Sequence, residues 1–498
     1  MNPELAKQLE AAGKTMNENG EMDRRAETSP ANGRRGGRPP IDYGALAEMY
    51  KTKNETVVRW YNGEFYEYDK ARGVYVRYTE RAASARVGAF LKSGPVLQPG
   101  CAPISYTSNA ERNVVGALRA TYDMGLAPPA FISTRKSAAG WFAMSNGLLD
   151  VEAAARGEAG ALHPHSPDFF STYALPFEWN PEARAERFMG FLADVQPVED
   201  GRAMLQMLAG LLLVPDTCYN VFFILQGEGG CGKSTYLKIV GAMLGADNVC
   251  SVPLSMFAEK HTTHRLTRTL ANLVEDSPTA DASRGFSLVG IEGVLKQVTD
   301  GGLLHVEPKG VDPWEAPATA RCVFAQNGPL PQFADRSNGI WDRLRVVPFP
   351  VRMRDTEGQN PHLAQEIIAE ELPGVFAWAV RGLGQLRQLR QFPQCAAGAA
   401  MIAGHRATCD REKTFLEERY KEMNGQFVPS REVYSAYTAW CEAEGYGGQK
   451  KNNGNFRNEV QRVFPGVRYE KRRWLGAAPQ WGYSNLTPLP EEVPEDGI

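Results

Sequence analysis

One stretch of nine residues, Gly227–Thr235, constrains this chain more than any other. It reads Gly-Glu-Gly-Gly-Cys-Gly-Lys-Ser-Thr and fits G-x-x-x-x-G-K-[ST], the pattern of a phosphate-binding loop. Before it, Val221–Leu225 is a run of β-branched and aromatic residues typical of a strand buried on both faces. After it, apolar residues recur at helical spacing as far as Leu244. Strand, glycine loop and helix are the context that the pattern needs, so the sequence predicts a site for a nucleoside triphosphate.

The chemistry expected of this loop follows from its residue types. Its four glycines let the backbone turn tightly and point its N–H groups at one spot, where the start of the helix adds a partial positive charge. We expect Lys233 to reach the β and γ phosphates of ATP and the hydroxyl of Ser234 to bind Mg²⁺. The residues expected around the phosphates are Gly227, Glu228, Gly229, Gly230, Cys231, Gly232, Lys233, Ser234 and Thr235.

An acidic pair follows the next apolar run. Leu270–Val274 is predicted to be a strand, and it leads into Glu275 and Asp276. In a nucleotide hydrolase one carboxylate holds Mg²⁺ while another orients and polarises the attacking water. We therefore expect Glu275 and Asp276 to lie with Ser234 at the Mg²⁺ site, where one carboxylate holds the ion and the other is directed at the water.

A third predicted strand begins at Arg321 and leads into Asn327. The amide of Asn327 can position the attacking water or the γ-phosphate. The residue types leave a second interpretation open, in which Asn327 only opens the turn before Pro329.

Basic residues occur at two other places near these strands. Residues Leu303–Asp312 read as a hairpin with Lys309 at its tip, beside a turn glycine. Arg343 and Arg345 flank the next apolar run. Arginines beside a strand are usually solvated, so their spacing alone assigns them no role.

Composition limits the broad class of protein. The chain has 498 residues, of which 23% are charged and 43% hydrophobic, and this length favours about three globular domains. The net charge is −3, so contact with nucleic acid must come from local basic patches. The eight cysteines contain no C-x-x-C pair, which argues against a zinc site or a disulfide framework and suits a reducing cytoplasm. No apolar run reaches the roughly 18 residues of a membrane helix, and we expect no membrane contact.

The N-terminal part reads as a tail followed by an α+β domain. Residues 1–40 are rich in Asn, Glu, Gly, Pro and Arg, which predicts disorder. Their basic end is typical of a solvated tail, with contact to DNA as the alternative. Asn62 and Gly63 join two alternating aromatic runs, which predicts a hairpin. Helices are expected as far as about residue 125, a strand and a turn over 142–150, and a helix pair over 184–214.

The C-terminal part reads as a separate unit after a linker around Ala396–Ala400. Three amphipathic helices are predicted near residues 415–418, 433–440 and 455–464, followed by a hairpin over 467–483. Residues 450–473 carry eight Lys or Arg against two Glu, which favours duplex DNA binding, with a solvated basic face as the alternative. The residues expected to contact DNA here are Lys450, Lys451, Arg457, Lys471, Arg472 and Arg473.

The order of these motifs resembles the helicase half of phage and plasmid primase-helicases, the superfamily 3 helicases related to the poxvirus replication ATPase. The resemblance covers roughly residues 140–385 and includes the loop, the acidic pair, Asn327 with the segment after it, and the region from Asp335 to Phe349. It implies an AAA+ ATPase that works as a hexameric ring with ATP and Mg²⁺. It also implies that Arg343, or Arg345 in its place, is an arginine finger completing a neighbour's site. Lys309, with His305, then stands where the family's pore hairpin follows single-stranded DNA.

Two departures from the family pattern affect these expectations. Cys231 replaces the family's usual asparagine in the loop, which backbone binding of phosphate should tolerate. The N-terminal part shows no pair of aspartates with a nearby histidine of the kind that a primase site needs. We therefore expect no primer synthesis and a separate primase or polymerase as partner.

The sequence therefore predicts an α/β protein with an AAA+ P-loop core. The expected divisions are a tail over 1–40, an N-terminal α+β domain over 41–190, the ATPase over 191–390, a winged-helix domain over 405–488 and an acidic tail over 489–498. The predicted function is ATP-dependent unwinding of forked DNA by a homo-hexamer that moves on single-stranded DNA, in a bacterial cytoplasm and in the service of a phage or prophage. The alternative is an ATP-switched initiator or loader that binds DNA without processive unwinding.

Overall fold

The computed structural model describes residues 41–61, 63–94, 96, 104–215, 217–259, 261–277, 289–307, 313–331, 333, 338–353, 360–444, 450–476 and 478–490. The chain forms two compact units. The first contains the residues up to Phe65 together with Tyr78–Asp123, and the second contains Tyr66–Arg77 together with the residues from Met124 onward. The predicted N-terminal tail and residues 491–498 of the acidic tail lie outside the described residues.

The first unit is a cluster of helices with a strand beside them. Each helix begins at a side-chain cap, because oxygens of Asp42, Thr79 and Thr107 accept hydrogen bonds from backbone N–H groups of the first turn. Strand β1 belongs to a three-stranded sheet of order β1-β2-β3. The elements are α2 (Tyr43–Asn54), β1 (Val58–Tyr61), β2 (Glu64–Asp69), β3 (Val74–Tyr78), α3 (Glu80–Lys92) and α4 (Ser108–Tyr122).

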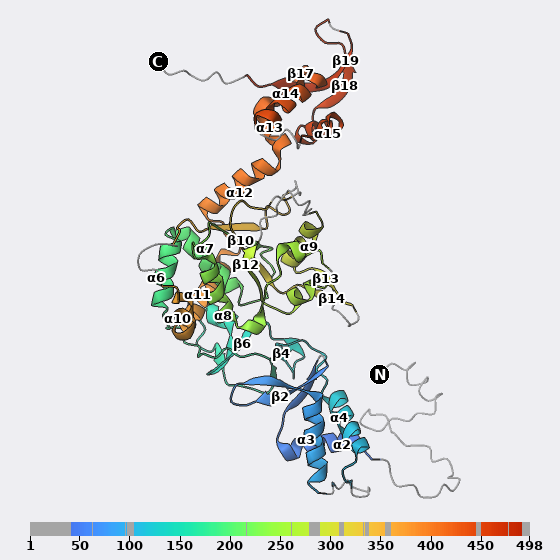
Figure 1. Ribbon diagram of the computed structural model, residues 1–498, viewed down its shortest axis with the longest axis vertical. Helices are drawn as coiled ribbons and strands as arrows, with labels where there is room; N and C mark the ends of the chain where they lie inside the picture. The colour runs from blue at the N-terminus through green and yellow to red at the C-terminus, as the bar shows by residue number, and fades with distance from the viewer. Residues whose placement is uncertain are drawn as a thin grey trace, which may run out of the picture. The chain divides into compact units, whose positions relative to one another are not determined.

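The second unit contains a five-stranded parallel sheet, of which Figure 1 labels β10 and β12. In spatial order its strands are β11 (Val249–Cys250), β12 (Ala271–Ser277), β15 (Arg321–Gln326), β10 (Phe222–Gln226) and β16 (Leu344–Pro348). All neighbouring strands pair in parallel, so their carboxyl ends meet at one edge. The three predicted strands are thereby confirmed, and β15 lies between the strand before the glycine loop and the strand before the acidic pair.

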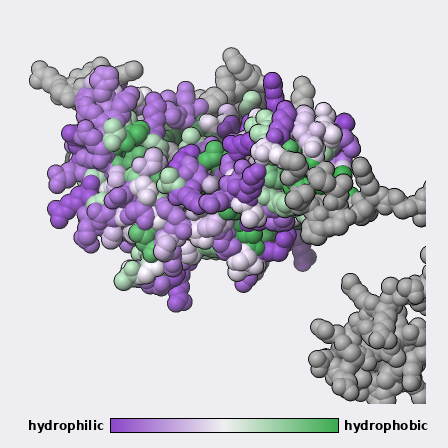
Figure 2. Space-filling model, turned by 90° about the horizontal axis from the view of Figure 1, so that it is seen from below, coloured by the Kyte–Doolittle hydropathy of each residue, from purple (hydrophilic) through white to green (hydrophobic). Residues whose placement is uncertain are grey.

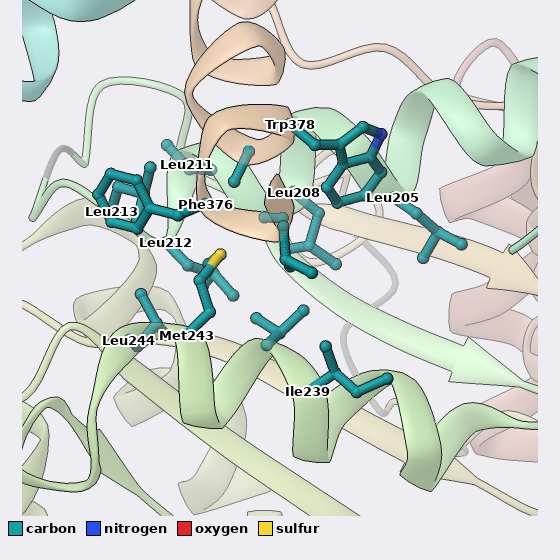
Figure 3. Close-up of a cluster of buried hydrophobic side chains, with 14 of the residues drawn as sticks. Leu205, Leu208, Leu211, Leu212, Leu213, Ile239, Met243, Leu244, Phe376 and Trp378 are labelled. Atoms are coloured by element: carbon teal, nitrogen blue, oxygen red, sulfur yellow. The ribbon is translucent and has the colours of Figure 1, made fainter. Parts of the chain in front are cut away.

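Helices cover one face of this sheet and bury the larger core. Phe223 and Leu225 of β10 face this core, whereas Phe222 and Ile224 face the other side, as the alternation along a strand requires. Figure 3 shows leucines of α7 meeting Met243 of α8 and aromatic side chains of α11. The helices of this layer are α6 (Glu186–Val195), α7 (Glu199–Leu211), α8 (Lys233–Leu244), α10 (Leu363–Glu370) and α11 (Leu372–Leu389).

Two glycines allow α7 and α11 to approach closely. A Cβ atom added to Gly382 would lie 2.2 Å from the carbonyl oxygen of Gln206, and one added to Gly210 would lie 2.3 Å from the backbone nitrogen of Leu383. Phe142 and Leu149 belong to the same core as these helices. Packing is therefore continuous across the predicted domain boundary at residue 190.

Short strands precede α6. The segment predicted as one strand and a turn forms a hairpin of β6 (Trp141–Met144) and β7 (Gly147–Asp150), and β8 (Leu162–His163) pairs with β7. A second small sheet contains β4 (Ala130–Phe131), β5 (Lys136–Ser137) and β9 (Phe169–Phe170). The short helix α5 (Val151–Ala155) follows β7 and lies against α11.

The other face of the large sheet packs against a second core. It includes α9 (Val289–Asp300) and the antiparallel strands β13 (Leu303–Val306) and β14 (Trp314–Pro317). The short 3₁₀ helices η2 (Leu254–Met256) and η3 (Thr263–Thr267) contribute Leu254 and Leu266 to this core, and a third, η1 (Ala246–Asn248), follows α8 and lies against it.

The prediction of a linker around Ala396–Ala400 is wrong. These residues begin a helix, α12 (Ala396–Cys409), which lies against β16. Four of its first five residues are alanine, which has the highest helix propensity, and Met401 and Ile402 pack against the second core. Propensity and packing together outweigh the small-residue composition that suggested a linker.

The C-terminal part has the three helices and the hairpin that the sequence predicts, and one strand that it does not. Its elements are α13 (Arg411–Arg419), β17 (Tyr420–Pro429), α14 (Ser430–Ala443), α15 (Asn453–Val463), β18 (Arg468–Arg472) and β19 (Gln480–Pro488). The unpredicted strand is β17, and the sheet order is β17-β19-β18. The core holds Phe415, Tyr437, Phe456 and Tyr483.

The surface is mostly polar where Figure 2 shows it. Hydrophilic residues predominate on that face, and hydrophobic ones form small separate patches. Among the helices that the structure describes, none has the length and apolar character needed to cross a bilayer.

Candidate nucleotide-binding site

The glycine loop joins β10 to α8 at the carboxyl edge of the sheet. Gly230 and Gly232 have φ angles of 84° and 91°, a region that side-chain-bearing residues rarely adopt. A Cβ atom on Gly232 would also lie 2.6 Å from a methyl carbon of Val195, and one on Gly227 would lie 2.6 Å from the carbonyl oxygen of Phe349. Conformation and close packing therefore both require glycine in this loop.

Lys233 opens α8 and turns back over the loop. Its ammonium group donates to the carbonyl oxygens of Gly227 and Glu228, both at 2.8 Å, and lies 3.2 Å from the sulfur of Cys231. It also donates to Oδ1 of Asn327 at 2.9 Å. The side chain is 5% exposed. Because an ammonium group has three donors, these oxygens hold it over the loop, where phosphate oxygens can replace them.

The acidic pair lies beside the start of α8. The hydroxyl of Ser234 is 3.5 Å from the carbonyl oxygen of Glu275, and the Glu275 carboxylate is 3.6 Å from the ammonium of Lys238. Both acidic side chains are exposed. Sequence reasoning missed Lys238, although its place one helical turn after Ser234 was a usable signal.

One cavity of about 700 Å³ connects these groups. The loop, Ser234, both acidic side chains and Asn327 line one side, and Phe191 and Asp194 of α6 line another. The third wall is a segment that the sequence analysis missed and for which no motif was available: Met353, Asn360, Pro361, Leu363, Ala364 and Gln365. Apolar atoms of this wall suit a nucleobase, while the loop suits phosphates.

The residues present fit Mg²⁺ bound together with a nucleotide. Ser234, Glu275 and Asp276 bring hydroxyl and carboxylate oxygens to the same cavity. Among the residues that the structure describes, no group of three or more His, Cys, Asp or Glu forms a self-sufficient metal cage. Mg²⁺ is usually held by one or two carboxylates with substrate phosphates, so the donor set suits this ion.

Arg343 stands at the opposite edge of the sheet from the loop. Its carbonyl oxygen accepts from the backbone N–H of Phe222 at the start of β10, whereas Lys233 follows the end of that strand. Five residues of β10 separate the two edges by roughly 16 Å. The guanidinium donates to both carboxylate oxygens of Asp300, at 3.0 and 2.8 Å, a partner that sequence reasoning missed.

Arg345, like Arg343, is partly buried. It donates to the carbonyl oxygens of Phe392 at 3.2 Å and Asp342 at 2.7 Å. Burial lowers the pKa of its guanidinium group below the ordinary value. Neither arginine lines the cavity that contains Lys233 of the same chain.

The structure describes one of the two residues predicted to follow single-stranded DNA, His305. Strands β13 and β14 form the predicted hairpin, and His305 is exposed on β13 opposite Glu315. Lys309 lies outside the described residues.

The basic residues of the C-terminal part divide into two groups. Lys450 pairs with Glu442 at 3.4 Å, and Lys451 pairs with Glu459 and with the buried Glu412. The charges of these two lysines are therefore balanced within the fold. The remaining predicted residues, Arg457, Lys471, Arg472 and Arg473, form no ion pair with any residue that the structure describes.

The fold is that of a mixed α/β protein with a parallel sheet. The site brings a glycine loop, a lysine, an acidic pair and an amide to one cavity. Three segments match known families: residues 106–197 match "D5 N terminal like", residues 225–343 match a family of unknown function, DUF5906, and residues 413–483 match "Poxvirus D5 protein-like". The first and last of these family models are both named for D5 proteins, and they lie on either side of the glycine loop in the sequence. The middle match contains every residue of the glycine loop, the acidic pair, Asn327 and Arg343.

Solved structures of the C-terminal region of NrS-1 are similar in fold. An A-form apo structure has a TM-score of 0.50 at 11% identity and covers 90% of this chain and all (100%) of its own. Another apo structure of that region has a TM-score of 0.52 at 12% identity, with 89% and 99% covered. The likeness extends over most of both chains and shows a similar fold.

Proposed function

We propose that this chain is an ATP-dependent DNA helicase of superfamily 3 that acts in the replication of a phage or a related mobile element. The observation that carries the proposal is the meeting of Lys233, Asn327 and the Ser234–Glu275 pair at one cavity. The D5-like segments on both sides of this site support a role in viral or phage replication, and the NrS-1-like fold is consistent with it.

In the proposed reaction the chain binds ATP in the cavity and directs water at its γ-phosphate. Lys233 exchanges its carbonyl and amide partners for β and γ phosphate oxygens. Glu275 polarises the water, and Asn327 orients either that water or the γ-phosphate. Mg²⁺ held by Ser234 and Asp276 would neutralise charge on the phosphates.

The proposed assembly is a homo-hexameric ring of AAA+ type. Arg343 lies at the sheet edge away from its own Lys233, so its guanidinium can complete only a site on a neighbouring copy. There it would stabilise charge on the γ-phosphate during transfer. Asp300 would hold the guanidinium until the neighbour's nucleotide replaces it. Arg345, whose guanidinium pKa is lowered by burial, is the less suitable candidate.

DNA contact is proposed at two places. The β13–β14 hairpin would carry Lys309 and His305 along a single strand, through phosphates and without sequence preference. The C-terminal part, with its helices α13 to α15 and the β18–β19 hairpin, would act as a winged-helix domain on forked DNA. A separate primase or polymerase in the host cytoplasm would complete the replication machinery.

The decisive experiment measures unwinding of a forked duplex by the wild type and by Lys233→Ala, with particle mass recorded in the same nucleotide. ATP- and Mg²⁺-dependent strand separation by ring-sized particles, lost in the variant, is the expected result. Particles that hydrolyse ATP and bind DNA but never separate strands would replace the helicase by an initiator or loader. Absence of hydrolysis in the wild type would overturn both.

A further inference from the structure

An exposed stack of side chains lies on the C-terminal hairpin. The guanidinium carbon of Arg457, on α15, is 5.0 Å from the centre of the Tyr469 ring on β18. The Tyr469 and Trp481 rings are stacked, with centroids 5.2 Å apart and planes within 7°. We call Arg457, Tyr469 and Trp481 the wing stack. Trp481 is its outermost member, with 53% of its surface exposed.

The exposure of Trp481 is unusual for the aromatic residues of this part of the chain. Phe415, Tyr437, Phe456 and Tyr483 are all buried in the core. A large aromatic ring left half in water forgoes the stabilisation that burial supplies. Because the Tyr469 ring already fixes the orientation of the indole, a further flat group can add to the stack without reordering it.

Positive charge surrounds the wing stack. Lys471 is the direct register partner of Trp481 across the β18–β19 ladder, and alternation along β18 places Lys471 on the same face as Tyr469. Lys471 and Arg473 are exposed and form no ion pair with a described residue. A flat aromatic surface with cations beside it matches a nucleobase with its phosphate.

We propose that the wing stack binds an unpaired base of DNA, which stacks on Trp481 while Lys471 contacts the adjacent phosphate. The proposal rests on the proposed function in taking DNA as the ligand. Bases inside a duplex are stacked on their neighbours, so an indole face can reach only a base in a single strand, at an end or at a fork. Stacking of this kind tolerates any base sequence. The C-terminal part would then recognise the junction between paired and unpaired DNA rather than a sequence in a groove.

The test uses the full chain without nucleotide and measures binding to a labelled single-stranded oligonucleotide and to a blunt duplex of equal length. Trp481→Ala is expected to weaken single-strand binding by about 5- to 150-fold, the loss typical of one stacked base. Binding to the blunt duplex should change by less than about threefold, because its bases are already stacked. Trp481→Phe should recover most of the single-strand affinity, since a phenyl ring still offers a stacking face.

A matched control is available on the same hairpin. Leu475 is 90% exposed but has no aromatic ring, so Leu475→Ala should leave binding to both DNAs unchanged. Lys471→Ala should weaken binding and reduce its dependence on salt by about one counterion.

Several outcomes would overturn the proposal. Equal losses on single strand and duplex in Trp481→Ala would mean that the hairpin contacts the duplex backbone. Unchanged DNA binding with a lower particle mass would mean that the indole is covered by a second copy of the chain. Unchanged binding and unchanged mass would remove the site altogether.

This test separates the wing stack from the proposed helicase activity. Trp481 lines no part of the nucleotide cavity, so DNA-independent ATP hydrolysis should be unchanged in Trp481→Ala. If the wild type unwinds forks but Trp481→Ala binds single strands normally, the stack is refuted and the helicase stands. If single-strand binding depends on Trp481 but no unwinding occurs, the helicase is refuted and the stack stands.

Discussion

The ammonium of Lys233 lies 2.9 Å from Oδ1 of Asn327, although 94 positions separate the two residues in the chain. The contact exists because β15 and β10 are neighbours in register, so the residues that follow the two strands meet. It links the lysine proposed to bind phosphate to the amide proposed to position the reacting group. The turn interpretation of Asn327 does not require this contact.

Asn327→Ala should therefore reduce ATP hydrolysis by roughly 10²-fold, the loss typical of one positioned polar group at a reacting centre. Nucleotide affinity should change far less, because Lys233 and the loop remain. Steady-state hydrolysis and nucleotide titration measure the two effects. Gln365→Ala is the control, since Gln365 is an amide on the same cavity that is not bonded to Lys233. Equal activity of both variants would favour the turn interpretation.

The position of Arg343 predicts complementation between two inactive variants. Lys233→Ala lacks a working loop and Arg343→Ala lacks the finger, so each should hydrolyse ATP at least about 10²-fold more slowly than the wild type. Mixed rings contain interfaces that combine an intact loop from one subunit with an intact Arg343 from the next. Activity should therefore reappear on mixing, as a hydrolysis titration would show. An Arg343 that acted within its own subunit would give no recovery.

Arg345→Ala serves as the comparison for that experiment. Its partners are backbone carbonyls in its own subunit, so its loss should lower thermal stability, with a smaller effect on the kcat of assembled rings. Full complementation by Arg345→Ala in place of Arg343→Ala would move the finger to Arg345.

Alanine substitutions at two helical glycines should have opposite effects, because Gly382 lies at the close contact between α7 and α11 whereas Gly190 of α6 has open space beside it. Gly382→Ala should destabilise the second unit by about 1–3 kcal/mol, because its Cβ would collide with the backbone of Gln206. Gly190→Ala lies in α6 with no atom within 4 Å of its added Cβ, and it should stabilise by about 0.5–1 kcal/mol through helix propensity. Thermal unfolding of both variants measures the difference, and a shift of the same sign in both would contradict it.

His405 predicts a pH dependence of stability. Its Nε2 lies 2.8 Å from the carbonyl oxygen of Pro331, and burial lowers the pKa of the imidazole below its ordinary 6.5. As pH falls, the imidazole of His405 is protonated in the unfolded chain before it is protonated in the folded chain. The stabilisation that neutral His405 contributes is therefore full above about pH 6.5 and is lost as pH falls through the lower folded pKa.

The variant His405→Gln should flatten the fall of the unfolding temperature between about pH 7.5 and pH 5, because glutamine does not titrate there. An unchanged slope in His405→Gln would show that other groups cause the fall.

Much of the site could be predicted because its signals are local. The glycine loop between a buried strand and a helix is set by backbone chemistry over a few residues. The runs before Glu275 and Asn327 are apolar enough to be recognised as strands. Helices α13, α14 and α15 follow from amphipathic spacing in the same way. The alanines of α12 misled the interpretation, because their composition suits both a linker and a helix.

The sequence by itself determined which residues are the candidates for phosphate chemistry, since the loop pattern and the residues that end the strands can be recognised from short consecutive segments. Only the tertiary structure decided which partners they have. Asp300 holds Arg343, Glu412 and Glu459 balance Lys451, and Tyr469 supports Trp481. The physical reason is that these contacts depend on strand order, register and helix packing, which bring together residues that no periodic pattern connects.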